Sequence, residues 1–359
     1  MKKHLFAICA VLTVMVSSCE KEVTTTNAIP PATQDELRGT FIVNEGLFGA
    51  GNGTVSFRSS DGSFISSDIF LAVNNSALGD VVQSMHIYNS KGFIVVNNSQ
   101  KVEVVSMNDF KKIKTITGFS SPRYFLPIDN NKAYVTDWFS NSAKIVDLNS
   151  LTITGSGPTG EGPEQMLLVN NKVYVCNAGG FGLDSSVTVI DAVTNSVLTT
   201  IEVGVNPGSL ILDSNGKIQV LCSGSTGPDY IGATADDIGS SIVTIDPVTN
   251  TVISDVSLGQ LVHPVKMVAN KYGDKIYFLF GVDGYSGSIK RYDMLSGIMY
   301  NVSNTTDLFY GLGVHPASGD IYAGRYGFNA NCYMLHFNEN SQLVDSALVG
   351  IGPNNFSFN

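Results

Sequence analysis

Large aromatic side chains occur in glycine-rich stretches of this 359-residue chain, outside any clear strand pattern. Such rings gain nothing from water, so several of them on one face would form a concave apolar surface for a ligand. The alternative is that individual rings fold back and cover the strands beneath them. The aromatic candidates for a ligand site are Trp138, Phe139, Phe181, Tyr230, Tyr285, Tyr326 and Phe328. We expect Trp138 to lie in one cluster with Phe139, Phe181 and Tyr326.

Four charged residues share these stretches and are further candidates for ligand binding: Glu45, Arg123, Glu164 and Arg325. Arg123 begins a predicted strand and would point inward, where a guanidinium group needs a carboxylate partner. Glu45 or Glu164 would supply that partner. For Glu45, hydrogen bonding within a turn is the alternative interpretation.

Residue patterns that support catalysis or metal binding are missing from the sequence. It contains no G-x-S-x-G, no H-E-x-x-H and no phosphate-binding glycine loop. The five histidines are scattered without metal-ligand spacing. Three cysteines, Cys176, Cys222 and Cys332, form no C-x-x-C pair, which favours buried reduced thiols. We therefore predict no enzyme activity, no bound metal and no cofactor.

The elements that carry the candidate residues are predicted by a repeat. The segment "VTVIDAVTNSVLTTIEVG" recurs as "IVTIDPVTNTVISDVSLG" in residues 242–259. Alternation of apolar and polar residues between turn residues is typical of strands. One recognisable strand returns every 40 to 60 residues or so, and its copies begin near Phe41, Phe93, Tyr134, Tyr174, Gln219, Tyr277 and Tyr322.

Four strands per repeat and seven repeats predict an all-β fold, a seven-bladed β-propeller with four antiparallel strands in each blade. The first repeat lacks its first strand, and "NNFSF" near the C-terminus resembles a first strand with nothing after it. We expect this C-terminal strand to join the N-terminal blade and close the ring, which removes exposed strand edges. The propeller would span residues 39–359.

The first residues predict export. Lys2 and Lys3 precede a short apolar run, which is too short to cross a bilayer and suits a signal peptide. The run ends in "VSSC", which resembles the bacterial lipobox, and this resemblance implies cleavage before Cys19 and a lipid on Cys19. An ordinary signal peptide is the alternative. Residues 1–18 would then be a lipoprotein signal peptide, and residues 19–38 a flexible tether.

The net charge is −10, and it becomes more negative when Lys2 and Lys3 are removed. A surface of that sign repels phosphate backbones, so we predict no nucleic-acid partner. Contact with a membrane would come through the lipid anchor only.

The segments "YVTD", "YVCNAG" and "VIDAVTN" resemble the YVTN-type (YncE-like) propeller repeat. A longer set is similar to DUF5074-like surface lipoproteins of Bacteroidetes: "NEGLFG", "SPRYF", "GEGPEQ" and "GVNPGSL". That resemblance implies a lipid-anchored protein on the outer membrane that captures a ligand and passes it to a TonB-dependent transporter. It implies a corrinoid as the first ligand, and a glycan is the second. A protein-binding or adhesive scaffold, and a propeller lactonase or hydrolase, remain alternatives.

Overall fold

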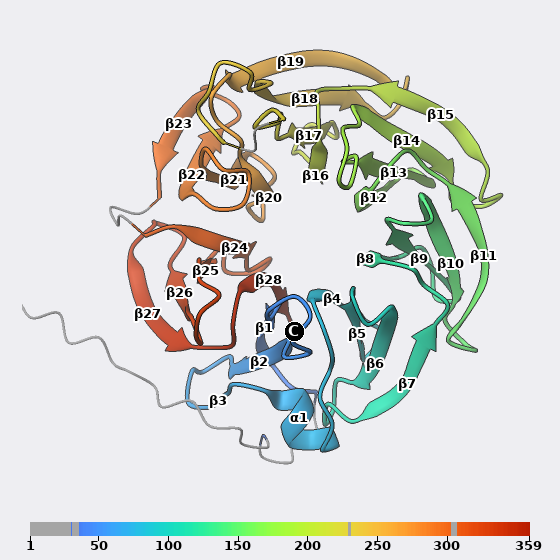
Figure 1. Ribbon diagram of the computed structural model, residues 1–359, viewed down its shortest axis with the longest axis vertical. Coiled ribbons are helices and arrows are strands. Elements are labelled where there is room, and N and C mark those ends of the chain that lie inside the picture. The colour runs from blue at the N-terminus through green and yellow to red at the C-terminus, as the bar shows by residue number, and fades with distance from the viewer. Residues whose placement is uncertain (1–29, 31–35, 229–230, 303–306) are drawn as a thin grey trace, which may run out of the picture.

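In the computed structural model, seven four-stranded antiparallel sheets surround a central axis (Figure 1). The structure describes residues 30, 36–228, 231–302 and 307–359. The strands nearest the axis are β4 (Val82–Tyr88), β8 (Pro122–Pro127), β12 (Pro163–Val169), β16 (Pro207–Leu212), β20 (Val265–Ala269), β24 (Phe309–Val314) and β28 (Pro353–Phe358). Each of these inner strands contacts the inner strands of both neighbouring sheets, which completes a ring. The predicted seven-bladed propeller is confirmed.

The other strands follow outward in sequence order within each sheet. The second strands are β1 (Gly39–Asn44), β5 (Lys91–Val96), β9 (Lys132–Asp137), β13 (Lys172–Asn177), β17 (Ile218–Cys222), β21 (Lys275–Phe280) and β25 (Ile321–Arg325). The third strands are β2 (Thr54–Ser59), β6 (Lys101–Ser106), β10 (Ser142–Asp147), β14 (Ser186–Asp191), β18 (Ser240–Asp246), β22 (Ser288–Asp293) and β26 (Tyr333–Phe337). The outer strands are β3 (Ile65–Ser66), β7 (Lys112–Thr117), β11 (Thr152–Pro158), β15 (Val197–Glu202), β19 (Thr251–Gly259), β23 (Ile298–Asn301) and β27 (Leu343–Leu348).

One short helix, α1 (Ile69–Asn74), was not expected from the repeat and follows the two-residue strand β3. The Asp68 carboxylate caps it by accepting a hydrogen bond from the Leu71 amide at 3.0 Å. Ile69 and Phe70 are buried, so the helix covers apolar surface beside the shortened outer edge of this sheet.

The repeated sequence encodes contacts between blades. The Tyr134 hydroxyl on β9 donates to Asn195 Oδ1 at 2.5 Å, and Asn195 belongs to the "AVTN" turn of the next blade. One blade further on, the Tyr174 hydroxyl donates to Asn250 Oδ1, in the "PVTN" turn, at 2.7 Å. The aspartate before each turn accepts backbone N–H groups, as Asp191 does from Val193 and Thr194 at 2.8 Å. The recurring Asp and Asn therefore shape turns and join blades.

The ring closes through the C-terminal strand, as predicted. Strand β28 pairs with β1 in antiparallel register, with Phe41 opposite Ser357 and Ile42 opposite Phe356. The chain enters at the same seam, where the Leu37 amide donates to the Met107 carbonyl at 2.7 Å and Asn359 Nδ2 donates to the Leu37 carbonyl at 2.8 Å. Both ends of the propeller are thus fixed at the start of β1.

Four ionisable side chains, which we call the closure cluster, join the last blade to this closing sheet: Arg58, Asp320, His336 and Asp345. Arg58 Nη2 lies 2.5 Å from Asp345 Oδ2, and His336 Nε2 lies 3.0 Å from Asp320 Oδ2. Burial lowers the pKa of His336, but the two aspartates outweigh burial and raise it. Burial raises the pKa of Asp345, but His336 and Arg58 outweigh burial and lower it.

These shifts predict a pH window for ring closure. The His336 contribution is complete below its ordinary pKa of 6.5 and is lost as the pH rises through the raised folded value. The Asp345 contribution is present above 3.8 and is lost as the pH falls through the lowered folded value. We expect the melting-temperature difference between wild type and His336→Gln to be largest near pH 5 and to shrink above pH 6.5. A difference that stays constant from pH 5 to pH 9 would contradict this role of His336.

Candidate functional site

Every inner strand bulges just after its first residue, so that one or two residues leave the hydrogen-bonded ladder. A bulge re-aims side chains, and here it occurs at the same end of every inner strand. The residues in the bulges include Gln83, Arg123, Glu164, Gly208, Lys266, Tyr310 and Asn354. We call these seven positions the axial ring.

Arg123 is the centre of one half of the axial ring. Its Nε and Nη2 atoms donate to Glu164 Oε1 at 3.0 and 2.7 Å, and its Nη1 donates to Gln83 Oε1 at 2.6 Å. Burial lowers the pKa of Arg123, but the Glu164 carboxylate outweighs burial and raises it. The guanidinium also lies over the Trp138 ring, 4.0 Å from its centroid. The structure thus pairs Arg123 with Glu164, one of the two partners that the sequence suggested.

Glu45 serves the other half of the axial ring. Its Oε2 accepts hydrogen bonds from the Tyr310 hydroxyl at 2.5 Å and from Asn354 Nδ2 at 3.1 Å. Burial, together with the charge of Glu45, raises the pKa of Tyr310 well above 10. Glu45 therefore holds two axial-ring residues in place, which is more than the turn-bonding role considered for it.

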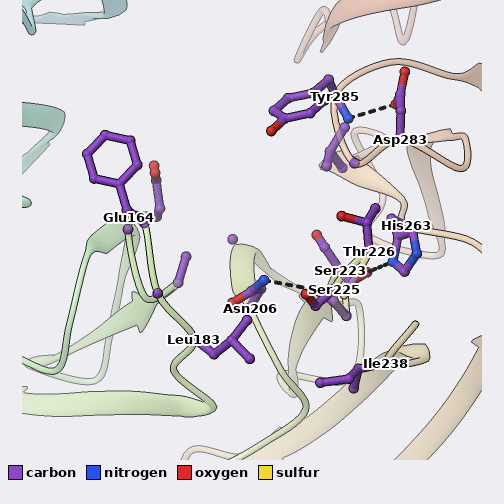
Figure 2. Close-up of a pocket in the computed structure, with 18 of the residues that line it drawn as sticks. Glu164, Leu183, Asn206, Ser223, Ser225, Thr226, Ile238, His263, Asp283 and Tyr285 are labelled. Carbon is purple, nitrogen blue, oxygen red and sulfur yellow. Dashed lines mark hydrogen bonds between the residues drawn. The ribbon is translucent and has the colours of Figure 1, made fainter. Parts of the chain in front are cut away.

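A pocket of about 660 Å³ opens where the axial ring is incomplete. Gly208 supplies no side chain on this arc, and no atom lies within 4 Å of the position that a Cβ atom would take there. The walls come from the loops β13–β14, β17–β18 and β21–β22 and from the crossings between these blades. Figure 2 shows Glu164 on one side of the pocket and Tyr285 on the other, with Asn206, Ser225 and Thr226 below Tyr285 in this view. These are the long loops that propeller topology places on one face.

His263 fixes one wall of the pocket. Both of its ring nitrogens face oxygen acceptors at 2.9 Å: Nε2 faces Asp237 Oδ2, and Nδ1 faces the Ser223 carbonyl. Both ring nitrogens are therefore engaged within the pocket wall. The hydrogen bond from His263 lowers the pKa of Asp237. With both nitrogens occupied, His263 ties two loops together and has no free nitrogen to take a proton from a substrate.

Three predicted aromatic residues lie together beside Arg123. The Trp138 ring is half-buried and meets Phe181 edge-on at 5.9 Å, and Phe139 lies 6.3 Å from Phe181. Phe181 is 86% exposed and lines the pocket, and Phe139 is 66% exposed. Trp138 Nε1 is buried and has no hydrogen-bond partner in the described part of the chain. Phe181 thus belongs to the pocket wall, whereas Trp138 and Phe139 contact Phe181 but do not line the pocket.

Tyr326 lies in a different group from the one that we expected. Its ring contacts Tyr310 at 6.1 Å and Phe328 at 5.7 Å, and no contact between Tyr326 and Trp138 occurs among the described rings. The expectation of one cluster with Trp138 is wrong, because the β25–β26 loop folds over its own blade. Of this second group, Tyr310 lines the pocket, and Tyr326 and Phe328 do not.

The remaining predicted residues fall in three places. Tyr285 lines the pocket and is 65% exposed. Arg325 is exposed and pairs with Asp307 at 2.6 Å, outside the pocket lining. Tyr230 and Cys19 lie outside the described residues, as do the predicted signal peptide and most of the tether.

Three functional candidates were missed from the sequence: Gly208, His263 and Lys266. All three belong to the repeated segment that begins each inner strand, visible as "SPRYF", "GPEQM", "NPGSL" and "HPVKM". Aligning these segments on the proline would have placed Arg123, Glu164, Gly208 and the region of Lys266 around one axis.

The described residues contain no group of three or more His, Cys, Asp or Glu side chains positioned to share a metal ion. Cys176, Cys222 and Cys332 are buried and free, and burial raises the pKa of Cys222 to about 12. In the described part of the chain, no helix is both long enough and apolar enough to cross a bilayer.

The pocket provides aromatic faces, hydrogen-bonding groups and charges around a concave space, which suits reversible binding.

Solved structures resemble the propeller at low sequence identity. A quinonprotein alcohol dehydrogenase-like protein from Bacteroides thetaiotaomicron superposes with a TM-score of 0.67 and 16% identity, over 90% of this chain and 78% of that chain. A functionally unknown protein from Desulfotomaculum acetoxidans gives 0.64 and 13%, over 89% and 98%. The hydrazine synthase of Kuenenia stuttgartiensis gives 0.64 and 14%, over 76% and 88%. At these identities the likeness supports the fold alone.

No curated protein matches the sequence. A family model does match it: residues 38–346 fit the model described as a domain of unknown function, DUF5074. Because the match covers most of the propeller, the chain belongs to the DUF5074 family.

Proposed function

We propose that this propeller is a non-catalytic binding protein that captures a ligand in the pocket beside the axial ring and passes it to a transporter. The observation that carries the proposal is the pocket of about 660 Å³ with large rings exposed at its rim. Phe181 and Tyr285 are mostly exposed, although burying such rings would be favourable. A ligand that stacks on them would remove this apolar surface from water.

A corrinoid is the first ligand in this proposal, because of the resemblance to surface lipoproteins that capture cobalamin. Its flat macrocycle would cover the rim rings, and its amide arms would meet the polar groups of the pocket. A glycan is the second ligand, since sugar rings also stack on exposed aromatic side chains. In the same proposal, a lipid on Cys19 anchors the protein to the outer membrane, and a TonB-dependent transporter receives the ligand. Membrane fractionation of wild type and Cys19→Ala tests the anchor.

Calorimetric titration with cyanocobalamin, and in a second arm with a panel of oligosaccharides, tests ligand capture. We expect Phe181→Ala to weaken binding by about 2 kcal/mol, as truncation of an interface hot spot commonly does. Stability should hardly change, because this side chain is exposed. Trp138 is less suited to this test, because its ring also covers Arg123 and its loss would disturb the axial ring. It serves instead as the fluorescence reporter, since it is the only tryptophan in the chain.

Leu295→Ala is the matched control. Leu295 is 96% exposed in the turn between β22 and β23, at the end of the blades away from the pocket. It should leave binding unchanged. Equal affinity of wild type and Phe181→Ala for a bound ligand would exclude the pocket rim as its site. Binding of a protein partner but of no small ligand would favour the adhesive scaffold instead.

A further inference from the structure

Lys266 differs from every other residue of the axial ring. It lies in the β20 bulge, lines the pocket and is the one charged residue of the ring with no carboxylate or guanidinium partner among the residues that the structure describes. We propose that Lys266 binds an anionic oxygen group of the ligand, either a carboxylate or a phosphodiester. This inference rests on the proposed function and deepens it, because it assigns a charge to the captured ligand.

The charges of the pocket wall lead to this assignment. Three basic side chains line the pocket: Arg123, His263 and Lys266. Arg123 is paired with Glu164 at 2.7 Å and His263 with Asp237 at 2.9 Å. Lys266 Nζ has no ion pair or hydrogen bond among the described residues. It lies over the Tyr310 ring, 5.7 Å from the centroid, and this contact orients the ammonium group without neutralising it.

The acidic residues of the wall are already engaged. Asp283 accepts the amides of Tyr285 and Ser286, both at 2.8 Å, and the Ser286 hydroxyl at 2.7 Å. Asp236 accepts the Thr234 hydroxyl at 2.7 Å. Neither carboxylate forms an ion pair with Lys266 within 4.0 Å. Both carboxylates keep their charge, but among the described residues Lys266 is the basic group of this arc that has no ion pair.

The backbone of Lys266 supports a functional role. Its φ is +59°, a left-handed conformation that costs a residue with a Cβ atom free energy. The other residues of the axial ring, such as Arg123 and Tyr310, do not have positive φ. The bulge thus places a lysine beside the gap left by Gly208, and it does so through a conformation that the repeat itself does not require.

The first experiment uses inorganic phosphate and acetate at constant ionic strength, with the intact chain and site-resolved NMR of the lysine side chains. We expect a saturable shift at Lys266 with millimolar affinity and no saturable shift at Lys91. Lys91 is a control because it also has no ion pair with a described residue and begins β5, at the opposite end of the blade. Lys266→Met should abolish saturable anion binding, while Lys91→Met should not. A Lys266 signal that does not saturate would overturn the proposal.

The second experiment identifies the source of the anion with two pairs of probes. Cyanocobalamin is compared with dicyanocobinamide, which lacks the phosphodiester, and trigalacturonate is compared with its methyl ester. For the pair that binds, we expect the anionic member to lose at least tenfold in affinity in Lys266→Met and to recover in Lys266→Arg. Equal losses for both members would overturn the assignment. If phosphate binds at Lys266 but none of the four probes binds, the anion site stands and the proposed ligands are wrong.

Discussion

Deletion of residues 352–359 should abolish the cooperative unfolding transition of the intact propeller. The deleted strand β28 forms the ladder with β1 and packs against β24 and β4 on its two sides. Without it the ring has a gap, the edge of β1 is exposed, and the buried side chain of Phe356 is lost. We expect a loss of 5 kcal/mol or more, on the order of the whole stability of a domain. Thermal unfolding followed by circular dichroism measures it.

A single change on the exposed outer strand serves as the control. Val344→Ser on β27 alters a side chain that is 54% exposed and should change stability by less than about 0.5 kcal/mol. A synthetic peptide of residues 350–359 should restore part of the transition, because the register with β1 does not require a covalent link. If the truncated protein melts at the wild-type temperature, closure by β28 contributes no stability.

Replacement of Arg123 by Met should lower the free energy of unfolding by roughly 3–5 kcal/mol, which is the usual effect of removing one partner of a buried ion pair. Glu164 would remain buried with its charge unpaired, and Gln83 would lose a donor. The Trp138 ring would also lose the guanidinium above it, so the fluorescence spectrum should change in the folded state. Denaturant unfolding monitored by Trp138 measures both effects.

Arg325→Met is the matched control, because Arg325 is exposed and pairs with Asp307 on the surface. It should cost less than about 1 kcal/mol. The double variant Arg123→Met/Glu164→Gln should recover part of the stability lost in Arg123→Met, because it removes the unpaired charge. Equal losses for Arg123→Met and Arg325→Met would show that the axial pair contributes no more than a surface pair.

The fold was predictable because its determinants are local and repeated. The Asp191 turn and its counterparts bond backbone amides only two or three residues away, so they leave a clear pattern in the sequence. The hydrogen bond between Tyr174 and Asn250 spans two blades, yet it also recurs with the repeat. The helix α1 replaces most of the outer strand in one blade. Because it occurs once, it leaves no repeated pattern in the sequence from which it could be predicted.

The site was only partly predictable. The pairing of Arg123 with Glu164 follows from the cost of burying an unpaired guanidinium group, which can be argued from sequence. The group that Tyr326 joins depends on how one loop folds, and loop residues carry no period. Lys266 was missed because its position depends on a bulge with positive φ, which arises from strand pairing and not from residue type.

The chain enters the propeller at the end of β1 that lies away from the pocket. Strand β1 runs from Gly39 to Asn44, and Glu45 directly after it bonds the axial-ring residues Tyr310 and Asn354. Leu37 and Arg38 therefore lie at the opposite end, about 20 Å away along the strand. If the protein is held to a bilayer through residues that precede Leu37, the pocket face of the propeller would point away from the membrane. Delivery of a captured ligand to a transporter in the same bilayer would then require the propeller to rotate relative to the membrane, so that its pocket face turns towards the transporter.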